Sequence, residues 1–176
     1  NFKRIGVLGG TFDPPHLGHL EISKFAIKKL KLKFLIWAVT KKNPLKNKSY
    51  FSLRKRINFS RNLVSKVNKI KIKTYDDKIK SSKTINLVKY LKKKYKKSEI
   101  FFLIGSDNLI KFHKWHDWKK ISNFCRIIVF PRTGYLKQVF NSKAYSYLGK
   151  EKIQFIKSKR INISSSKIRK NYLKYN

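Results

Sequence analysis

The stretch GGTFDPPHLGH, Gly9–His19, directly follows the apolar run Ile5–Leu8. Two glycines after a strand let the backbone turn sharply and approach a ligand closely. Asp13-Pro14-Pro15 cannot continue a strand or lie inside a helix, so we expect it to shape the turn into a helix that begins near Leu17. The stretch therefore predicts a strand–turn–helix unit with a ligand site at the turn.

Further apolar runs alternate with helical patterns along the chain, which indicates a parallel sheet covered on both faces. We expect strands at Arg4–Leu8, Phe34–Val39, Lys69–Lys73, Ile100–Ile104, Ile127–Phe130 and Arg160–Ile163, and helices at Leu17–Leu30, Leu53–Val67, Thr84–Tyr95, a short pair around Asn108–Ile121, and Ser165–Tyr172. The predicted fold class is α/β, a doubly wound, Rossmann-like sheet with helices on both faces. No linker or internal repeat divides the chain, so we expect a single domain over residues 1–176. Such sheets bind ligands beyond the carboxyl ends of their strands.

The composition predicts a globular protein of a reducing compartment. Hydrophobic residues make up 41% of the 176 residues, enough for a core without disulfides. The lone Cys125 has no partner for an internal disulfide, which favours a reducing environment. No apolar run approaches the roughly 20 residues of a membrane span, and no signal peptide is evident, so we expect a cytoplasmic protein with no membrane partner.

The formal net charge of +37 allows two interpretations. A basic surface is the electrostatic signature of nucleic-acid binding. However, only 8 of the 45 basic residues are Arg, and the Lys residues are spread over nearly the whole chain. This distribution favours Lys on solvated faces, so we expect no nucleic-acid partner. The positive field would still draw small anions toward a cleft.

His16 and His19 are three residues apart at the predicted start of the first helix and therefore share a face. The first turn of a helix has unpaired N–H groups and the positive end of the helix dipole, which favour an anion. Together with the hydroxyl of Thr11, the two imidazoles form a candidate phosphate cradle. A packing role alone would leave the surrounding glycines and prolines unexplained.

A second His-x-x-His pair, His113 and His116 in KFHKWHDW, raises the alternative of a zinc site built from four histidines. Against this alternative, Cys125 stands alone and only eight acidic residues are present to complete the coordination. We therefore expect no metal held by the protein, and partly exposed side chains for the second pair.

The stretch RINISSSKIRK, Arg160–Lys170, contains a second candidate anion site. One serine suffices to cap a helix, but here three serines precede Lys167 and Arg169. Ser165 and Arg169 are four residues apart and share a helix face. Two strand-to-helix anion sites in one small domain predict a polyphosphate substrate held from both sides.

These two motifs together resemble the HxGH superfamily of nucleotidyltransferases, here as His16-Leu17-Gly18-His19, and the resemblance covers nearly the whole chain. Within that superfamily, three further segments resemble bacterial nicotinate-nucleotide adenylyltransferases. They are FFLIGSDNLIKFHKW (Phe101–Trp115), SSKTINLV (Ser81–Val88) and IIVFPRTGY (Ile127–Tyr135).

One loop departs from the family pattern. The family often has a Pro-Pro-His-Lys-like loop after the second strand, and this chain has VTKKNPLK, Val39–Lys46, in its place. Only Pro44 and Lys46 match, and Leu45 replaces the imidazole. Lys46 keeps the charge that a phosphate would meet.

The resemblance implies a reaction and its site residues. The reaction is adenylyl transfer from ATP to nicotinate mononucleotide, giving deamido-NAD and pyrophosphate, with Mg²⁺ arriving with ATP. Trp115 would stack on the pyridine ring, and backbone N–H groups near Thr84 and Trp115 would hold the nicotinate carboxylate. The implied catalytic residues are His16, His19 and Arg169; the implied ATP-binding residues are Gly9, Gly10, Thr11, Phe12, His16, His19, Gly105, Asp107, Ser164, Ser165, Ser166 and Arg169; the implied mononucleotide-binding residues are Lys46, Thr84, Trp115 and Arg132.

Two other functions fit parts of the sequence. A pantetheine-phosphate adenylyltransferase or a cytidylyltransferase of the same superfamily shares both phosphate motifs, although the segment Gly105–Trp115 argues against either. A basic nucleic-acid-binding α/β module would use the Lys excess instead. The sequence does not indicate an oligomeric state.

Overall fold

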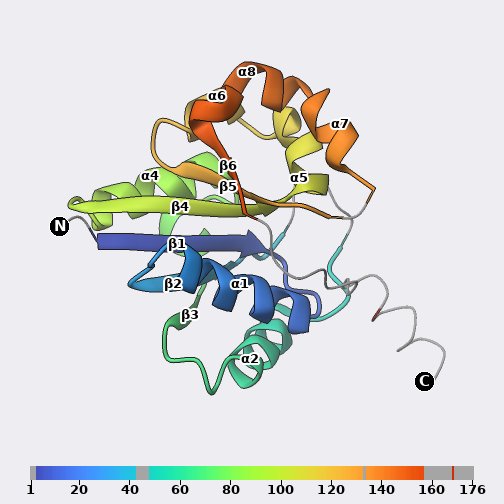
Figure 1. Cartoon of the computed structure of the whole chain (residues 1–176). Coiled ribbons are helices and arrows are strands. Elements are labelled where there is room, and N and C mark those ends of the chain that lie inside the picture. The colour runs from blue at the N-terminus through green and yellow to red at the C-terminus, as the bar shows by residue number, and fades with distance from the viewer. Residues whose placement is uncertain (1–2, 43–47, 133, 157–167, 169–176) are drawn as a thin grey trace.

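Six parallel strands form one sheet in the order β3-β2-β1-β4-β5-β6 (Figure 1). The computed structural model describes residues 3–42, 48–132, 134–156 and 168. The strands are β1 (Lys3–Gly10), β2 (Phe34–Val39), β3 (Ile70–Lys73), β4 (Ser98–Gly105), β5 (Arg126–Phe130) and β6 (Ile153–Phe155). The helices are α1 (Leu17–Lys29), α2 (Leu53–Leu63), α3 (Asp76–Ile79), α4 (Thr84–Lys94), α5 (Ser106–Ile110), the 3-10 turn η1 (Phe112–Lys114), α6 (Trp118–Ile121), α7 (Leu136–Phe140) and α8 (Lys143–Lys152).

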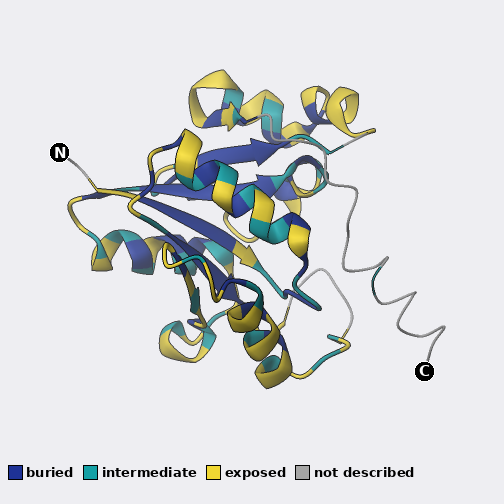
Figure 2. Ribbon diagram, turned by 60° about the horizontal axis from the view of Figure 1, so that its bottom comes forward, coloured by how far each residue is buried: buried dark blue, intermediate teal, exposed yellow. Residues whose placement is uncertain are grey.

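Side chains of the central strands alternate between two hydrophobic clusters, one on each face of the sheet. On β1, Val7 joins the cluster that contains residues of α4, α5, α6, α7 and α8, whereas Leu8 joins the cluster that contains residues of α1 and α2. Apolar residues at both alternating positions are what a sheet buried on both faces requires. In Figure 2 the strands are therefore largely dark blue, while the helices turn yellow faces outward.

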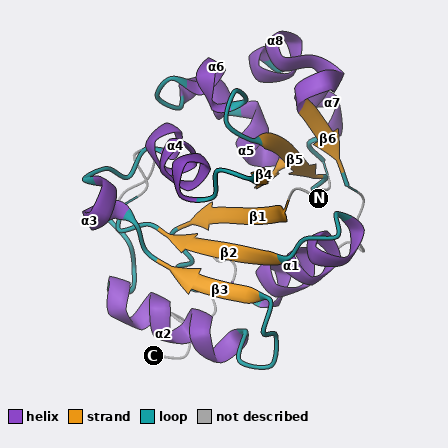
Figure 3. Ribbon diagram, turned by 90° about the vertical axis from the view of Figure 1, so that its left-hand side faces the viewer, coloured by secondary structure: helices purple, strands orange, loops and turns teal. Residues whose placement is uncertain are grey.

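The strand order reverses at β1. On one side β1 pairs with β2, where Val7 lies opposite Ile36, and on the other side it pairs with β4, where Val7 lies opposite Phe102. The chain first builds outward through β2 and β3, and then returns to the other side of β1 (Figure 3). The carboxyl ends of β1 and β4 thus flank the switch point at which doubly wound sheets bind their ligands.

The predicted doubly wound α/β class is confirmed, and the differences lie in the boundaries, in the short helix α3, which we did not predict, and in the last third of the chain. Strand β1 continues to Gly10 rather than ending at Leu8, and α2 ends at Leu63 rather than at Val67. The sixth strand is Ile153–Phe155, which we did not predict. The predicted strand 160–163 lies outside the described residues, as does the predicted helix 165–172 apart from Ile168, which is helical.

Helices α7 and α8 were not predicted because neither gives a long apolar period in the sequence. Helix α7 has only five residues, and Gly149 interrupts α8 with a φ of 64°. No helix among the described residues combines the length and the apolar character that crossing a membrane requires. The single domain and the cytoplasmic location stay predictions.

Candidate active site

A cleft of about 1070 Å³ opens at the carboxyl ends of β1, β2, β4 and β5. It brings together the β1–α1 loop, the start of α4 and the segment around η1. The predicted site residues that line it are Gly9, Gly10, Thr11, Phe12, His16, His19, Thr84, Gly105, Asp107, Trp115 and Arg132. Those that fall outside the described residues are Lys46, Ser164, Ser165, Ser166 and Arg169.

Gly9 and Gly10 end strand β1 at the floor of the cleft. Neither has a positive φ, so the predicted sharp turn at the glycines is wrong; the left-handed residue is Phe12, with a φ of 49°. A Cβ at Gly9 would meet Phe102 ring carbons at 3.5 Å, an ordinary contact. Backbone conformation and packing thus do not demand glycine at this position.

The ring of Phe12 turns back against β2 and supports His19. It stacks on Trp37 with ring centroids 4.8 Å apart, and its centroid lies 4.9 Å from that of His19. Nε1 of the buried Trp37 donates to Oγ of Ser23 (2.8 Å), and this hydroxyl donates to the carbonyl of His19 (2.7 Å). These contacts fix the first turn of α1 to the central sheet.

His16 and His19 lie ring against ring, with centroids 3.8 Å apart. The backbone N–H of His16 donates to Nδ1 of His19 (3.2 Å), so the neutral His19 ring carries its proton on Nε2. Burial and the nearby charge of Arg132 lower the pKa of His16 to about 4. Burial, then the charges of His16 and Arg132, lowers the pKa of His19 well below 6.5. Both rings are therefore neutral at pH 7 and each offers one N–H.

Arg56 on α2 is 1% exposed, and the sequence analysis missed it. Its guanidinium donates to four backbone carbonyls: Thr11 at 2.6 Å, Thr40 at 2.8 Å, Phe51 at 3.0 Å and Lys41 at 3.2 Å. One side chain thus joins the β1–α1 loop, the end of β2 and the approach to α2. The only signal in the sequence was a basic residue on the apolar side of a predicted helix.

Asp13 ties the same loop to the approach to α2. The buried carboxylate accepts from the backbone N–H groups of Tyr50 (2.6 Å) and Phe51 (2.8 Å). We expected Asp13 to shape the turn, and the structure adds this tertiary contact. The N–H and the carbonyl of Phe51 are therefore both held, by Asp13 and by Arg56.

Asp76 on α3 holds the end of β2 in a similar way. It accepts from Oγ1 of Thr40 (2.7 Å) and from the backbone N–H of Lys41 (2.8 Å). Burial lowers the pKa of Arg56, and the negative charges of Asp13 and Asp76 oppose that effect. The buried charge of Arg56 is thus balanced by two carboxylates, which accept from N–H groups of the same loops.

On the other side of the switch point, Arg132 lies across the start of α5. Its Nη1 is 3.2 Å from Oδ2 of Asp107, and its backbone N–H donates to the buried hydroxyl of Ser106 at 2.8 Å. A Cβ at Gly105 would overlap Oδ1 of Asp107, so glycine is what allows this ion pair to close over the end of β4. Asp107, which we predicted to bind ATP, and Arg132, which we predicted to bind the mononucleotide, are therefore in direct contact.

The far end of the cleft lies between the start of α4 and Trp115. The ring of Trp115 is supported by Phe112, at 4.9 Å between centroids. The N–H of Trp115 donates to the carbonyl of Phe112 (3.0 Å), and the expectation that backbone N–H groups near Thr84 and Trp115 hold a carboxylate stays a prediction. The N–H of Thr84 belongs to the first turn of α4 and has no partner within the described part of the chain.

The two histidines of the second pair, His113 and His116, lie in different surroundings. Nδ1 of the half-buried His113 lies 3.0 Å from the carbonyl of Ile110, away from the cleft. His116 is exposed and lines the cleft, a position that we did not predict. Across residues 3–42, 48–132, 134–156 and 168, no group of three or more His, Cys, Asp or Glu side chains is arranged to hold a metal ion.

Ile168 is the described residue of the second anion motif. It lines an apolar groove of about 520 Å³ together with Pro14, Pro15, Phe51, Phe59, Asn62 and Leu63. This residue therefore lies beside the β1–α1 loop, which carries the first anion motif.

Comparison with known proteins gives first the class and then the nearer relatives. A model of the cytidylyltransferase-like family matches residues 7–171, and the chain belongs to this family. A Pelagibacter ubique protein named probable nicotinate-nucleotide adenylyltransferase is 52% identical over 167 residues, covering 95% of this chain and 92% of that protein. A protein of the same name from Aquifex aeolicus is 37% identical over 164 residues, covering 91% of this chain and 98% of that protein. The resemblance inferred from the motifs is confirmed.

A solved structure agrees with the fold. Plasmodium falciparum nicotinic acid mononucleotide adenylyltransferase complexed with NaAD superposes with a TM-score of 0.74 at 20% identity, covering 96% of this chain and 83% of that one. The likeness supports the nucleotidyltransferase type of the doubly wound sheet.

Replacing Arg56 tests whether its guanidinium holds the three segments together. We expect Arg56→Met to lower the free energy of unfolding by about 3–5 kcal/mol, because it leaves two carboxylates and several buried carbonyls without their cation. Arg56→Lys should lower it by about 1–3 kcal/mol, because an ammonium cannot reach four carbonyls in a planar fork. Urea unfolding gives both values. The control is Arg54→Met, at an exposed position two residues earlier, which should stay within about 0.5 kcal/mol of the wild type.

The lowered pKa of His16 predicts a pH-dependent stability. Between pH 6.5 and about 4 the unfolded chain takes up a proton at His16 that the folded chain does not, so the free energy of unfolding falls as the pH falls through this range. A His16→Asn variant should lose about 1–3 kcal/mol less than the wild type over the same range. Urea unfolding at pH 7, 6, 5 and 4 measures this difference. Parallel curves for the two proteins would contradict the buried neutral state of His16.

Proposed function

We propose that this chain is an adenylyltransferase that joins nicotinate mononucleotide and ATP to give deamido-NAD and pyrophosphate. The observation that carries the proposal is one cleft with two different ends. A pair of neutral imidazoles lies at the end of β1, and an aromatic ring with the free first turn of α4 lies across from it. The first end suits a polyphosphate and the second suits a planar ring with a carboxylate. The identity to nicotinate-nucleotide adenylyltransferases supports the same pair of substrates.

The reaction needs positioning rather than a base. An oxygen of the mononucleotide phosphate attacks the α-phosphorus of ATP, a P–O bond forms, and the bond from the α-phosphorus to the bridging oxygen breaks as pyrophosphate leaves. The nucleophile is already an anion, so no proton has to be removed. In our proposal, His16 and His19 donate N–H groups to the phosphate oxygens on which negative charge grows.

We assign the remaining roles from the positions of the residues that line the cleft. We place the adenosine beside Gly105 and Asp107, and the pyridine ring on Trp115 with its carboxylate at the N–H of Thr84. Arg132 touches Asp107 and its charge acts on both histidines, which suits a position where the phosphates of the two substrates meet. Close backbone approach at Gly9, Gly10 and Thr11 serves the ATP phosphates, with Phe12 supporting His19 from behind. From the resemblance, Lys46 serves the mononucleotide phosphate, and Ser164, Ser165, Ser166 and Arg169 serve the triphosphate.

In the same proposal Mg²⁺ enters as the ATP complex. It neutralises charge on the phosphates and keeps most of its water ligands, as Mg²⁺ does in nucleotide sites. The carboxylates that line the described part of the cleft are Asp13, Asp76 and Asp107, and each already interacts with protein donors. Such a donor set fits a metal ion carried mainly by the nucleotide.

A pyrophosphate-release assay tests the function. With ATP and millimolar Mg²⁺, we expect turnover of nicotinate mononucleotide, weaker turnover of nicotinamide mononucleotide, and none of phosphopantetheine. An amide brings an NH₂ donor to a site that offers N–H groups, which costs on the order of 1–3 kcal/mol. Activity should survive a zinc-selective chelator. Equal or better turnover of the amide would contradict the assignment, and activity lost together with stoichiometric zinc would favour the four-histidine site.

The histidine pair has its own test. We expect His16→Ala and His19→Ala each to lower kcat roughly 10²–10³-fold, with a smaller change in mononucleotide binding, because each removes a donor whose effect grows in the transition state. His19→Asn keeps a shorter donor and should fall between His19→Ala and the wild type. The matched control is His113→Ala, which changes a histidine outside the cleft. Near-normal turnover in both alanine variants would mean that the pair is not used in the reaction, and a large loss of melting temperature would indicate a structural role.

A further inference from the structure

The indole of Trp37 lies behind the histidine pair, in the middle of the sheet. Trp37 is a residue of β2 and is fully buried, whereas Trp115 and Trp118 are only half-buried. A buried indole needs an acceptor for its N–H, because leaving that donor unpaired away from water is costly. A purely apolar side chain would fill the same core position without this requirement. The N–H of Trp37 therefore calls for a reason beyond packing.

The acceptor of this N–H is the hydroxyl of Ser23, a residue of α1 that is also fully buried. Nε1 of Trp37 donates to Oγ of Ser23 (2.8 Å), and Oγ donates onward to the carbonyl of His19 (2.7 Å). The hydroxyl thus uses a lone pair toward the sheet and its one proton toward the helix. A central strand is in this way joined through a single hydroxyl to the first turn of α1.

Trp37 also supports the ring of His19. Phe12 stacks on the indole, with 4.8 Å between centroids and 17° between planes, and the centroid of Phe12 lies 4.9 Å from that of His19. The centroids of Trp37 and His19 are 5.9 Å apart in an edge-on arrangement. Two sets of contacts, one to the backbone carbonyl of His19 and one to its ring, therefore start from the same indole.

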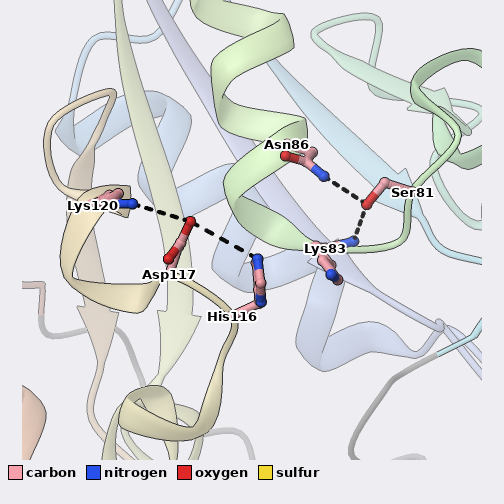
Figure 4. A network of polar contacts seen from close by, with 6 residues as sticks. All are labelled: Ser81, Lys83, Asn86, His116, Asp117 and Lys120. Carbon is pink, nitrogen blue, oxygen red and sulfur yellow. Dashed lines mark hydrogen bonds and ion pairs between the residues drawn. The ribbon is translucent and has the colours of Figure 1, made fainter.

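Polar contacts at the far end of the cleft are of a different kind. Oδ2 of Asp117 lies 3.9 Å from Nε2 of His116 and 3.4 Å from Nζ of Lys120, and all three residues are exposed (Figure 4). Water competes for exposed ion pairs, so such pairs hold a geometry weakly. The hydrogen bonds of Trp37 are closed to water and hold their partners more firmly.

We propose that Trp37 is a positioning residue for the adenylyl transfer, because it sets the place from which Nε2–H of His19 reaches the phosphate oxygens. The proposal rests on the proposed function and adds to it Trp37 and Ser23, neither of which lines the cleft. The backbone N–H of His16 donates to Nδ1 of His19 at 3.2 Å, and this bond keeps the proton on Nε2 only while the ring stays in place. A displacement of about 1 Å can cost roughly 100-fold in rate, so even a small shift of the ring matters.

The experiment removes the two buried hydrogen-bonding partners singly and together. Ser23→Ala leaves the N–H of Trp37 without its acceptor, Trp37→Phe removes that N–H and keeps an aromatic ring, and the double variant removes both groups. We expect kcat to fall about 5- to 30-fold in all three, with KM for both substrates within about twofold of the wild type. The loss of melting temperature in the double variant should be smaller than the sum of the two single losses, because no unpaired N–H remains.

The matched control is Ser60→Ala in α2. Ser60 is fully buried, and its hydroxyl donates to the carbonyl of Arg56, four residues earlier, at 2.8 Å. The bond is thus of the same kind as the bond from Ser23 to His19. We expect Ser60→Ala to lower the melting temperature by a few degrees and to leave kcat within about twofold of the wild type.

A second measurement needs no substrate. Nitrogen NMR shifts of an imidazole show which ring nitrogen carries the proton. In the wild type and in Ser60→Ala, we expect the two ring nitrogens of His19 to keep distinct shifts at pH 7. In Ser23→Ala and in the double variant the shifts should move toward their average, because a displaced ring loses the bond from His16 and exchanges between tautomers.

The outcomes separate this inference from the proposed function. If the wild type turns over nicotinate mononucleotide and both single variants keep its kcat, the proposal for Trp37 is overturned and the function stands. A kcat that recovers with the melting temperature in the double variant also overturns it, because Trp37 and Ser23 would then serve stability alone. If the wild type shows no turnover, the proposed function fails, and the imidazole shifts of the same variants still decide whether Trp37 positions His19.

Discussion

The guanidinium of Arg56 is the contact on which the cleft depends. The carbonyls that it meets lie 45, 16, 15 and 5 residues before it in the sequence, in the β1–α1 loop, at the end of β2 and in the approach to α2. A planar group with five donors satisfies carbonyls of all three segments at once. Asp13 and Asp76 hold N–H groups of the same segments and balance the buried charge. The loops are therefore positioned by buried polar contacts and not by packing alone, which is what preorganised catalysis requires.

The chain as a whole carries a net charge of +37, but the two histidines of the cleft carry none of it. At the end of β1 the cleft has two imidazoles that burial keeps neutral, with the charge of Arg132 nearby. Neutral donors bind the ground state weakly, and their contribution grows as charge develops on the phosphate oxygens. The surrounding lysines supply attraction at long range, where tight binding is not at stake.

The sequence predicted those features that arise from neighbours along the chain. The apolar runs marked β1, β2, β3, β4 and β5, and the glycines, prolines and histidines of residues 9–19 marked the strand–turn–helix unit. The misses share a different cause. The partners of Arg56 are backbone carbonyls, which every residue has, so no sequence pattern reveals them. The position of His116 on the cleft depends in the same way on how η1 folds against the sheet. The short β6 has too few residues to give a period.

The two ends of the cleft differ in how firmly the fold holds them. Strand β1, which leads into the β1–α1 loop, is paired on both sides in the middle of the sheet, so the amides of β1 exchange with solvent only when most of the domain opens. The far end of the cleft is formed by the four-residue helix α3, the 3-10 turn η1 and the first turn of α4. These short elements open locally at much smaller cost. A fold with this division can change the short elements at one end of its cleft through evolution while the central strand at the other end stays the same.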